Sequence, residues 1–292
     1  MILWRCRARA WIIACLLLAA CSSEPPSAQS SGYPERIVSL SPHLAELVFA
    51  IGAGDLLIGV SAYTDYPDAA ARLPVVGDAF NLDLEQLALL EPDLLLAWDT
   101  GTPAHVIDEL VARGYRVEVI TTTGVADVPL AMNRIGALTG RPSPAGEAAA
   151  AFRASLAEIA DRYSDASAIS VFYQVDARPL YTINGQHFLS DLIELCGGRN
   201  IFGDLDGLAP LISVEAVLER DPEVILASTD AGPSAFDEWD RWQALAANRY
   251  GNRFLMPAND IGRPTPRLLN GAKALCQALA DGRQNRDAAH HD

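Results

Sequence analysis

Basic residues are scarce in this sequence. Its 292 residues include 22 Lys and Arg against 37 Asp and Glu, which gives a formal net charge of −15. Nucleic acids and anionic membrane surfaces bind basic patches, so this balance argues against both as partners. The acidic excess does not identify a substrate.

Common catalytic motifs are missing as well. The sequence has no G-x-S-x-G, P-loop, H-E-x-x-H or G-x-G-x-x-G pattern, and of its five histidines only the tail pair His290 and His291 is closely spaced. His43 lies in the first turn of an expected helix, where we expect solvation or capping rather than ligand contact. We therefore expect no catalytic cofactor and no metal site. An enzyme stays an alternative, because catalytic groups need only meet in space.

The N-terminal sequence predicts an export signal. Three arginines precede an apolar stretch, Ala10–Ala20, that is too short to cross a bilayer. The following Leu-Ala-Ala-Cys resembles the lipobox of bacterial lipoproteins, which implies a signal peptide at 1–20 and a lipid on Cys21. Ser22, where Asp would favour the inner membrane, favours the outer membrane. A plain signal peptide with an incidental cysteine is the alternative. Residues 21–34 form a Ser/Pro-rich tether.

Two cysteines, Cys196 and Cys276, lie beyond the N-terminal region. In an exported protein such a pair most simply forms a disulfide. The bond would close a loop of about 80 residues and contribute about 4 kcal/mol in the chain-entropy model. Two buried thiols are the alternative.

Strands and helices are expected to alternate in two blocks. The first block, 35–142, has expected strands at 36–40, 57–60, 94–98 and 116–120, with helices at 43–52, 84–90, 103–114 and 125–140. The second, 166–281, has strands at 169–174, 224–227 and 254–256, with helices at 188–195, 214–220 and 267–280. A single helix, 143–165, joins them, and 282–292 is expected to be a disordered tail. The predicted fold class is α/β: two Rossmann-like lobes with parallel sheets, bridged by one long α-helix.

One stretch occurs twice. Residues 83–98 read DLEQLALLEPDLLLAW and residues 213–228 read SVEAVLERDPEVILAS. Both place a Glu seven residues before a Pro, then an acidic residue and an apolar run. Helix, turn and strand recur in any α/β protein, which explains part of the match. That common pattern gives the weakest explanation for the position of Glu85 and Glu215, each at the start of its helix.

Aromatic residues gather just after expected strands, where open α/β sheets bind ligands. They are Tyr63, Tyr66, Phe80, Trp98 and Tyr181. Each alone suits core packing, whereas the group on both blocks favours a binding cleft between two lobes.

Several segments together carry a family resemblance. In order and spacing, it rests on RIVSLSPHLAELVFAIG, GVSAYTDYP, NLDLEQLALLEPDLLLAW, LSDLIELCGGRNIF, SVEAVLERDPEVILAS and RPTPRLLNGAKALC. They resemble the vitamin B12 (cobalamin) periplasmic binding proteins of ABC importers, within the helical-backbone family that binds metal chelates, siderophores, haem and cobalamin. The resemblance spans about residues 35–281. It implies limited hinge motion and a ligand held between the lobes.

The resemblance also assigns roles to residues. Glu85 and Glu215 would dock on arginines of the permease dimer, and Cys196–Cys276 would be the family's disulfide. The implied ligand-binding positions are Tyr63, Phe80, Trp98, Tyr181, Asn259, Asp260 and Arg263. Asn259 stands where the family has an acidic residue, with Asp260 next to it. Two family tryptophans align with Ala79 and Ala209, and Phe80 could substitute for the first.

The resemblance predicts a monomeric periplasmic lipoprotein that captures cobalamin or a related corrinoid and delivers it to an ABC importer without catalysing a reaction. A haem or ferric-siderophore binder of the same family is the first alternative. Siderophore complexes are often anionic and would need more arginine than Arg263, which favours a corrinoid. An extracytoplasmic α/β enzyme is the second alternative.

Overall fold

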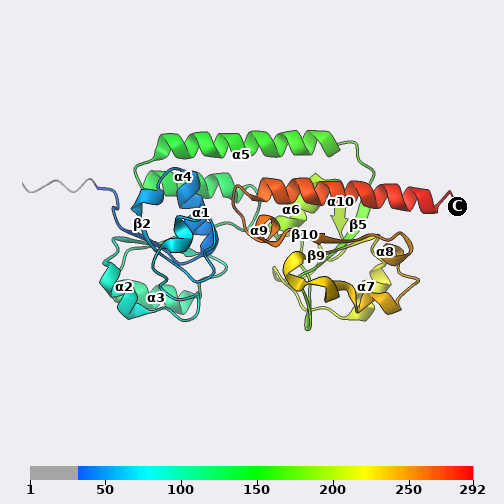
Figure 1. The fold of residues 1–292 in the computed structure, drawn as a ribbon, viewed down its shortest axis with the longest axis horizontal. Coiled ribbons are helices and arrows are strands. Elements are labelled where there is room, and N and C mark those ends of the chain that lie inside the picture. Colours follow the sequence, from blue (N-terminus) through cyan, green and yellow to red (C-terminus); the bar gives the residue numbers. More distant parts are fainter. Residues whose placement is uncertain (1–31, 292) are drawn as a thin grey trace, which may run out of the picture. The chain divides into compact units, whose positions relative to one another are not determined.

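Two parallel four-stranded sheets form the centre of the protein. The computed structural model describes residues 32–291, and residues from Pro34 onward form one compact unit. Within that unit the sheets have strand orders β2-β1-β3-β4 and β10-β9-β5-β8, one in each lobe (Figure 1). Their strands are β1 (Ile37–Ser39), β2 (Leu57–Val60), β3 (Leu94–Trp98), β4 (Val117–Ile120), β5 (Ile169–Gln174), β8 (Gly198–Asn200), β9 (Val224–Ser228) and β10 (Arg253–Met256). Read in reverse, the second order matches the first, so β1 corresponds to β5 and β3 to β9.

The predicted α/β alternation of both lobes is confirmed. The helices are α1 (Pro42–Ala50), α2 (Leu84–Leu90), α3 (Ala104–Ala112), α4 (Asp127–Leu138), α5 (Pro142–Tyr163), α6 (Phe188–Leu195), α7 (Val214–Arg220), α8 (Ala246–Arg249), α9 (Ala258–Ile261) and α10 (Leu268–Ala289). Short 3-10 turns occur at Gly54–Leu56, Ala70–Arg72, Thr229–Ala231, Pro233–Phe236 and Trp239–Arg241. The strand β8 and the antiparallel pair β6 (Asp176–Ala177) and β7 (Leu180–Tyr181) were not predicted, because two or three residues carry no periodicity.

Each sheet buries both of its faces. Successive side chains of a strand point to opposite sides, so Leu94 and Leu96 join one apolar cluster while Leu95 and Ala97 join another. The strands β5 and β9 divide their side chains in the same way. The first of these clusters is continuous through both lobes, since it contains residues of α1, α4, α5, α6 and α10. This shared core limits how far the lobes can move apart.

The helix α5 bridges the lobes, as predicted. It runs from Pro142 to Tyr163 and lies along both lobes in Figure 1. Its buried face consists of Ala145, Ala149, Phe152 and Ile159, and a proline at the start suits the first turn. A Cβ on Gly136 of α4 would lie only 2.2 Å from the Cβ of Ala145, so this glycine permits α4 and α5 to pack closely.

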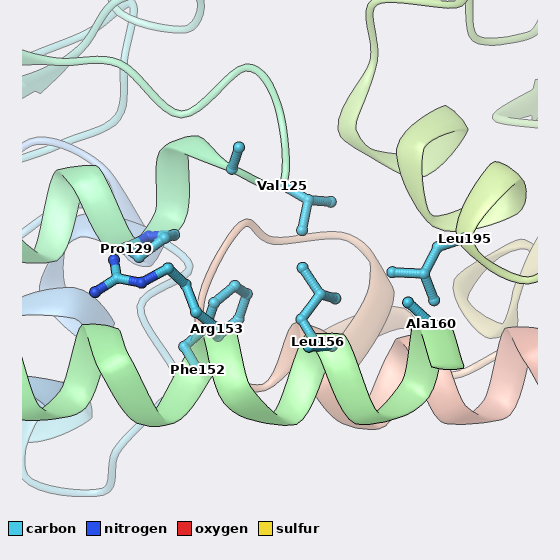
Figure 2. Close-up of a pocket in the computed structure, with 9 residues that line it drawn as sticks. Val125, Pro129, Phe152, Arg153, Leu156, Ala160 and Leu195 are labelled. Carbon is cyan, nitrogen blue, oxygen red and sulfur yellow. The ribbon is translucent and has the colours of Figure 1, made fainter. Parts of the chain in front are cut away.

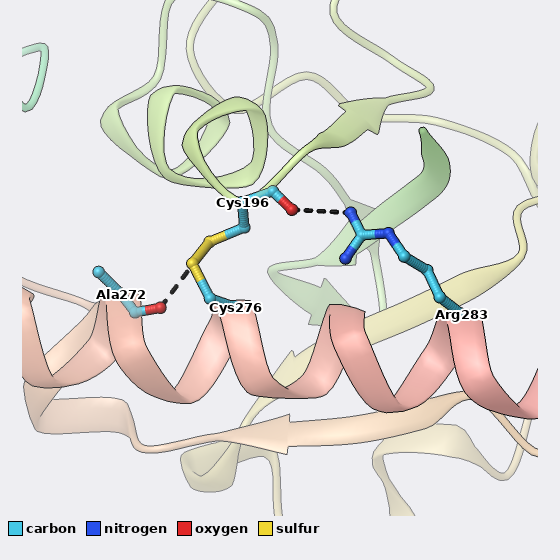
Figure 3. The surroundings of a disulfide bond; sticks show 4 residues. All are labelled: Cys196, Ala272, Cys276 and Arg283. Atoms are coloured by element: carbon cyan, nitrogen blue, oxygen red, sulfur yellow. Dashed lines mark hydrogen bonds between the residues drawn. A yellow bond between two sulfur atoms is a disulfide. The ribbon is translucent and has the colours of Figure 1, made fainter. Parts of the chain in front are cut away.

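A disulfide joins Cys196 and Cys276, as the sequence predicted. It links the end of α6 to α10 across 80 positions of the chain, and both residues are fully buried (Figure 3). The backbone of Cys196 is also held by Arg283, whose Nη2 donates a hydrogen bond to the carbonyl oxygen at 2.7 Å. The C-terminal helix is therefore fixed to its lobe by a covalent bond and by a buried arginine.

The predicted disordered tail at 282–292 is wrong for residues up to Ala289, because α10 continues to that position. Polar composition suggested fraying, but two arginines on one face of the helix find partners. Arg283 is 8% exposed and its Nε donates to the Ser167 oxygen at 2.6 Å. Arg286 donates to the Ala168 oxygen and to Glu223. These contacts extend the helix by more than two turns.

Replacing Arg283 by alanine should lower the free energy of unfolding by about 2–3 kcal/mol, because the buried carbonyl of Cys196 and the part-buried carbonyl of Ser167 lose a charged donor. Urea denaturation measures this change. The control is Gln284→Ala, an exposed residue on the same turn, which should change stability by less than about 0.5 kcal/mol. Equal effects of the two substitutions would show that the tail adds no specific stability.

The predicted signal peptide at 1–20, the predicted lipidation site Cys21 and residues 21–31 of the predicted tether lie outside the described residues. Among residues 32–291, no helix combines the length and apolarity needed to cross a bilayer.

Candidate functional site

The ligand-binding candidates follow the carboxyl ends of strands. Tyr63 follows β2 and Trp98 ends β3 in the first lobe, while Tyr181 belongs to the hairpin after β5 in the second. Asn259 and Asp260 lie in α9 and Arg263 just beyond it, all following β10. The carboxyl ends of parallel strands are the usual binding edge of such sheets.

Arg263 brings the two edges together. Its Nη2 donates to the backbone oxygen of Tyr63 at 3.0 Å, 200 positions away in the chain. Its Nη1 donates to Glu46 Oε1 at 3.0 Å and also to Asp65. The carboxyl end of β10 therefore faces the carboxyl end of β2 at the lobe boundary.

Tyr63 projects from a fixed loop. Its side chain is 82% exposed and its backbone φ is 65°, a conformation that few non-glycine residues adopt. The next residue anchors the loop, since Thr64 Oγ1 donates to the Ser61 oxygen at 2.8 Å. A stiff aromatic side chain held open to solvent at a strand edge is suited to contact a flat ligand.

Trp98 lies half-buried at the end of β3. Its backbone N–H donates to Thr102 Oγ1 at 3.0 Å, and its ring packs edge-on against His43 with the ring centres 4.8 Å apart. The indole Nε1 is buried without a hydrogen-bond partner in the described chain. Contacts within the first lobe, from Thr102 to the backbone and from His43 to the ring, thus position the indole.

His43 is part of that support, which the sequence analysis did not foresee. Expected to be solvated or capping, it is 3% exposed and hydrogen-bonded to Ser41 Oγ at 2.6 Å and Thr122 Oγ1 at 3.1 Å. Burial, with a smaller contribution from the charge of Arg263, lowers the pKa of His43 to about 3, so the ring is neutral. The available signal was a polar residue just after each of two strands, Ser41 after β1 and Thr122 after β4.

Phe80 occupies a separate part of the first lobe. It is 74% exposed on a turn in which Asp78 Oδ1 accepts from the N–H groups of Phe80 and Asn81, each at 2.8 Å. These backbone hydrogen bonds lower the pKa of Asp78. Phe80 borders a pocket of about 300 Å³ against α3 that includes His105. Within the described residues, no hydrogen bond or ion pair joins Phe80, Tyr181 or Asn259 to another candidate.

The two positions at which the resemblance implies a tryptophan carry alanine, Ala79 in the first lobe and Ala209 in the second. Ala79 is half-buried and Ala209 is exposed. Trp239 is fully buried and donates its Nε1–H to Gln174 Oε1 at 2.8 Å, so it belongs to the core.

Glu85 and Glu215 occupy equivalent places. Each is the second residue of a seven-residue helix, α2 or α7, and each is exposed. The N-cap side chains Asp83 and Ser213 accept from backbone N–H groups at 2.8 and 3.2 Å. Hydrogen bonds from its own backbone N–H and from Ser213 lower the pKa of Glu215. No salt bridge engages either glutamate within residues 32–291.

The other acidic residue of the repeat has a structural role. Asp93 accepts from the backbone N–H groups of Glu35 and Arg36, at the start of β1. Glu223 accepts from the N–H and hydroxyl of Ser170, at the start of β5. In each copy of the repeat, the acid after the proline therefore holds the first strand, whereas the glutamate at the helix start is exposed.

A second pocket of about 300 Å³ lies on the helical side of the lobe boundary (Figure 2). Its walls are side chains of α4, α5 and α6, among them Pro129, Phe152, Leu156 and Leu195. Its lining is almost wholly apolar. In the described part of the chain, no three His, Cys, Asp or Glu residues form a group that could hold a metal ion.

Comparison with known proteins identifies relatives that share this sequence and fold. The model of the periplasmic binding protein family matches residues 37–259. A vitamin B12-binding protein of Vibrio campbellii is 34% identical over 259 residues, which cover 88% of this chain and 94% of that protein. The crystal structure of the periplasmic vitamin B12 binding protein BtuF of Vibrio cholerae aligns with a TM-score of 0.78 and 31% identity, over 86% of this chain and 98% of that one.

A periplasmic haem-binding protein of Pseudomonas aeruginosa also shares the fold, with a TM-score of 0.74, 25% identity and coverage of 84% of this chain and 92% of that one. The match of the family model over most of the chain, together with two parallel-sheet lobes bridged by one helix, identifies the family. This chain belongs to the periplasmic binding protein family.

Proposed function

We propose that this protein captures cobalamin or a related corrinoid between its lobes and delivers it to an ABC importer. The observation that carries the proposal is the junction of Tyr63 and Arg263, which joins two ligand-binding edges in a chain 34% identical to a vitamin B12-binding protein. Tyr63, Trp98 and Tyr181 would provide flat walls for the ring. Phe80, Asn259, Asp260 and Arg263 would complete the site.

Delivery would use Glu85 and Glu215. A permease dimer with two-fold symmetry presents the same surface twice, and one exposed glutamate per lobe can address both copies. Charge complementarity across an interface sets orientation and encounter rate. The protein would act in the periplasm as a monomer, with a lipid on Cys21 that retains it at a membrane, the outer one being favoured by Ser22. No catalytic step is required.

Haem is the second candidate, because a haem-binding protein shares the fold. The surroundings of Arg263 favour a corrinoid instead. That guanidinium already contacts the carboxylates of Glu46 and Asp65, so its charge is offset within the protein. The edge of a corrin ring carries amides, whereas the edge of haem carries carboxylates that would need a free cation.

The proposal is tested by adding cyanocobalamin to the purified protein and dialysing extensively. Retained red absorbance at one equivalent per protein supports it. Loss of all colour from protein whose circular dichroism shows a native fold would contradict it.

Trp98→Ala should weaken cyanocobalamin binding by about 1–3 kcal/mol, or roughly 5- to 150-fold, because one aromatic wall is removed. Titration calorimetry measures the affinity. The matched control is Trp242→Ala, a half-buried tryptophan at the edge of the second lobe's core, which should leave the affinity within about twofold. An unchanged affinity in Trp98→Ala would place this residue outside the binding surface.

A further inference from the structure

Glu46 is a buried acid in the mostly apolar helix α1. It lies in α1 between Ala45 and Leu47, both fully buried, and its own side chain is 2% exposed. An unpaired carboxylate in such a place would be strongly destabilising. Its presence in the interior therefore requires partners that the sequence around it does not supply.

The partners come from the other lobe. Glu46 Oε1 accepts from Arg263 Nη1 at 3.0 Å and from Arg267 Nη2 at 2.6 Å, and Oε2 accepts from Arg267 Nε at 3.0 Å. Both arginines precede α10, 217 and 221 positions along the chain. The bidentate contact with Arg267 fixes the planes of both groups.

The same two arginines hold the loop that carries Tyr63. Arg263 binds the Tyr63 carbonyl oxygen, and the guanidinium of Arg267 lies over the Tyr66 ring, 4.4 Å from its centre. One buried carboxylate thus orients two arginines, and these orient the residues 61–67 at the carboxyl end of β2. Removing Glu46 would release the loop without removing any side chain of the binding surface.

Neighbouring carboxylates offset the positive charges of both arginines in this cluster. Arg263 and Arg267 face three carboxylates, since Asp65 contacts Arg263 and Asp260 Oδ1 lies 3.9 Å from Arg267 Nη1. The side chains of the two arginines are only 20% and 18% exposed. A carboxylate of a ligand would meet no uncompensated positive charge here.

We infer that Glu46 is a positioning residue of the binding cleft: it clasps Arg263 and Arg267 across the lobe boundary, orders the Tyr63 loop, and makes the cleft select ring ligands edged with amides over those edged with carboxylates. The selectivity part rests on the proposed function. The clasp itself does not, because it concerns the protein without ligand.

Glu46→Gln tests both parts, because glutamine keeps the shape but removes the charge. Hydrogen exchange of the mature protein without ligand, read by mass spectrometry, should show faster exchange at 61–67 and 258–267 with the rest of both lobes unchanged. Unaltered exchange in these two segments overturns the clasp. Faster exchange throughout α1 and its core would also overturn it, since it would mark general destabilisation.

Selectivity is measured with two ligands that differ by one group: cyanocobalamin and its monocarboxylate, in which one edge amide is hydrolysed. Glu46→Gln should weaken cyanocobalamin binding about tenfold and reduce the preference for the amide form at least threefold, because arginine charge is freed. Equal weakening of both ligands overturns the selectivity role. Failure of the wild-type protein to bind either ligand refutes the proposed function, while the exchange result still decides the clasp.

Asp65→Asn provides a milder variant, since Asp65 is 45% exposed and its loss does not threaten folding. It should shift the preference in the same direction by about twofold. Asp55→Asn removes an exposed ion pair with Arg141 at the amino end of β2 and serves as control. The selectivity role is refuted if Asp65→Asn changes the preference for the amide ligand no more than Asp55→Asn does.

Discussion

Replacing Glu85 and Glu215 together by alanine should reduce ligand import by about a hundredfold or more while ligand affinity stays within about twofold. Both carboxylates are exposed at equivalent helices, and neither is part of an ion pair in residues 32–291. Truncating one partner of a charge pair buried across an interface costs several kcal/mol of binding, and two such proposed contacts would be lost at once. Import is measured as uptake of labelled cobalamin by cells that depend on the variant.

A matched control replaces Asp108 and Glu219, exposed acids on α3 and α7, one per lobe. It preserves the loss of two negative charges but should leave uptake near the wild-type level. Uptake that survives in the Glu85/Glu215 variant refutes docking by these residues. A collapse of ligand affinity in that variant would assign them to ligand binding instead.

The second large effect is expected for stability. Cys196→Ala combined with Cys276→Ala should lower the free energy of unfolding by about 4 kcal/mol, because the unfolded chain regains the freedom of a loop of 80 residues. The residues are fully buried, so the substitution also leaves small cavities under α10. Denaturation in urea, followed by circular dichroism, gives the difference.

Reductant separates the covalent contribution from the packing contribution. Dithiothreitol should lower the stability of the wild-type protein to near that of the variant and leave the variant unchanged. A variant within about 1 kcal/mol of the oxidised wild type would show that the loop closure contributes little and that the contacts of Arg283 are sufficient.

The regular part of the fold could be predicted from the sequence because its periodicity is strong. The bounds expected for β5, α6 and α7 agree with the structure, and α5 begins within one residue of the expected position. The end of α10 could not be predicted, because Arg283 and Arg286 are stabilised by carbonyl groups and by Glu223, which lie over 60 positions away. Composition alone does not reveal such partners.

The repeat shows how much of a residue's role local sequence can predict. It located Glu85 and Glu215 at matching helix starts, but it did not reveal that Asp93 and Glu223 hold the first strand of each lobe. The difference depends on which acid faces a backbone N–H in three dimensions.

At the candidate site, the partners of Glu46 could not be predicted from the sequence. A charge between buried apolar residues of α1 was visible in the sequence, and an arginine could have been expected as its partner. Which arginine, and from which lobe, depends on how the last connection crosses the boundary. The link from Arg263 to Tyr63 follows from the same geometry.

The most direct test of ligand capture is a competition. Equal concentrations of cyanocobalamin, cobinamide, haem and a ferric siderophore are dialysed together against the purified protein, and the bound fraction is identified by absorbance and mass spectrometry. We expect one equivalent of bound corrinoid and little haem or siderophore. Haem or siderophore in the bound fraction, with the corrinoids left free, would contradict this expectation.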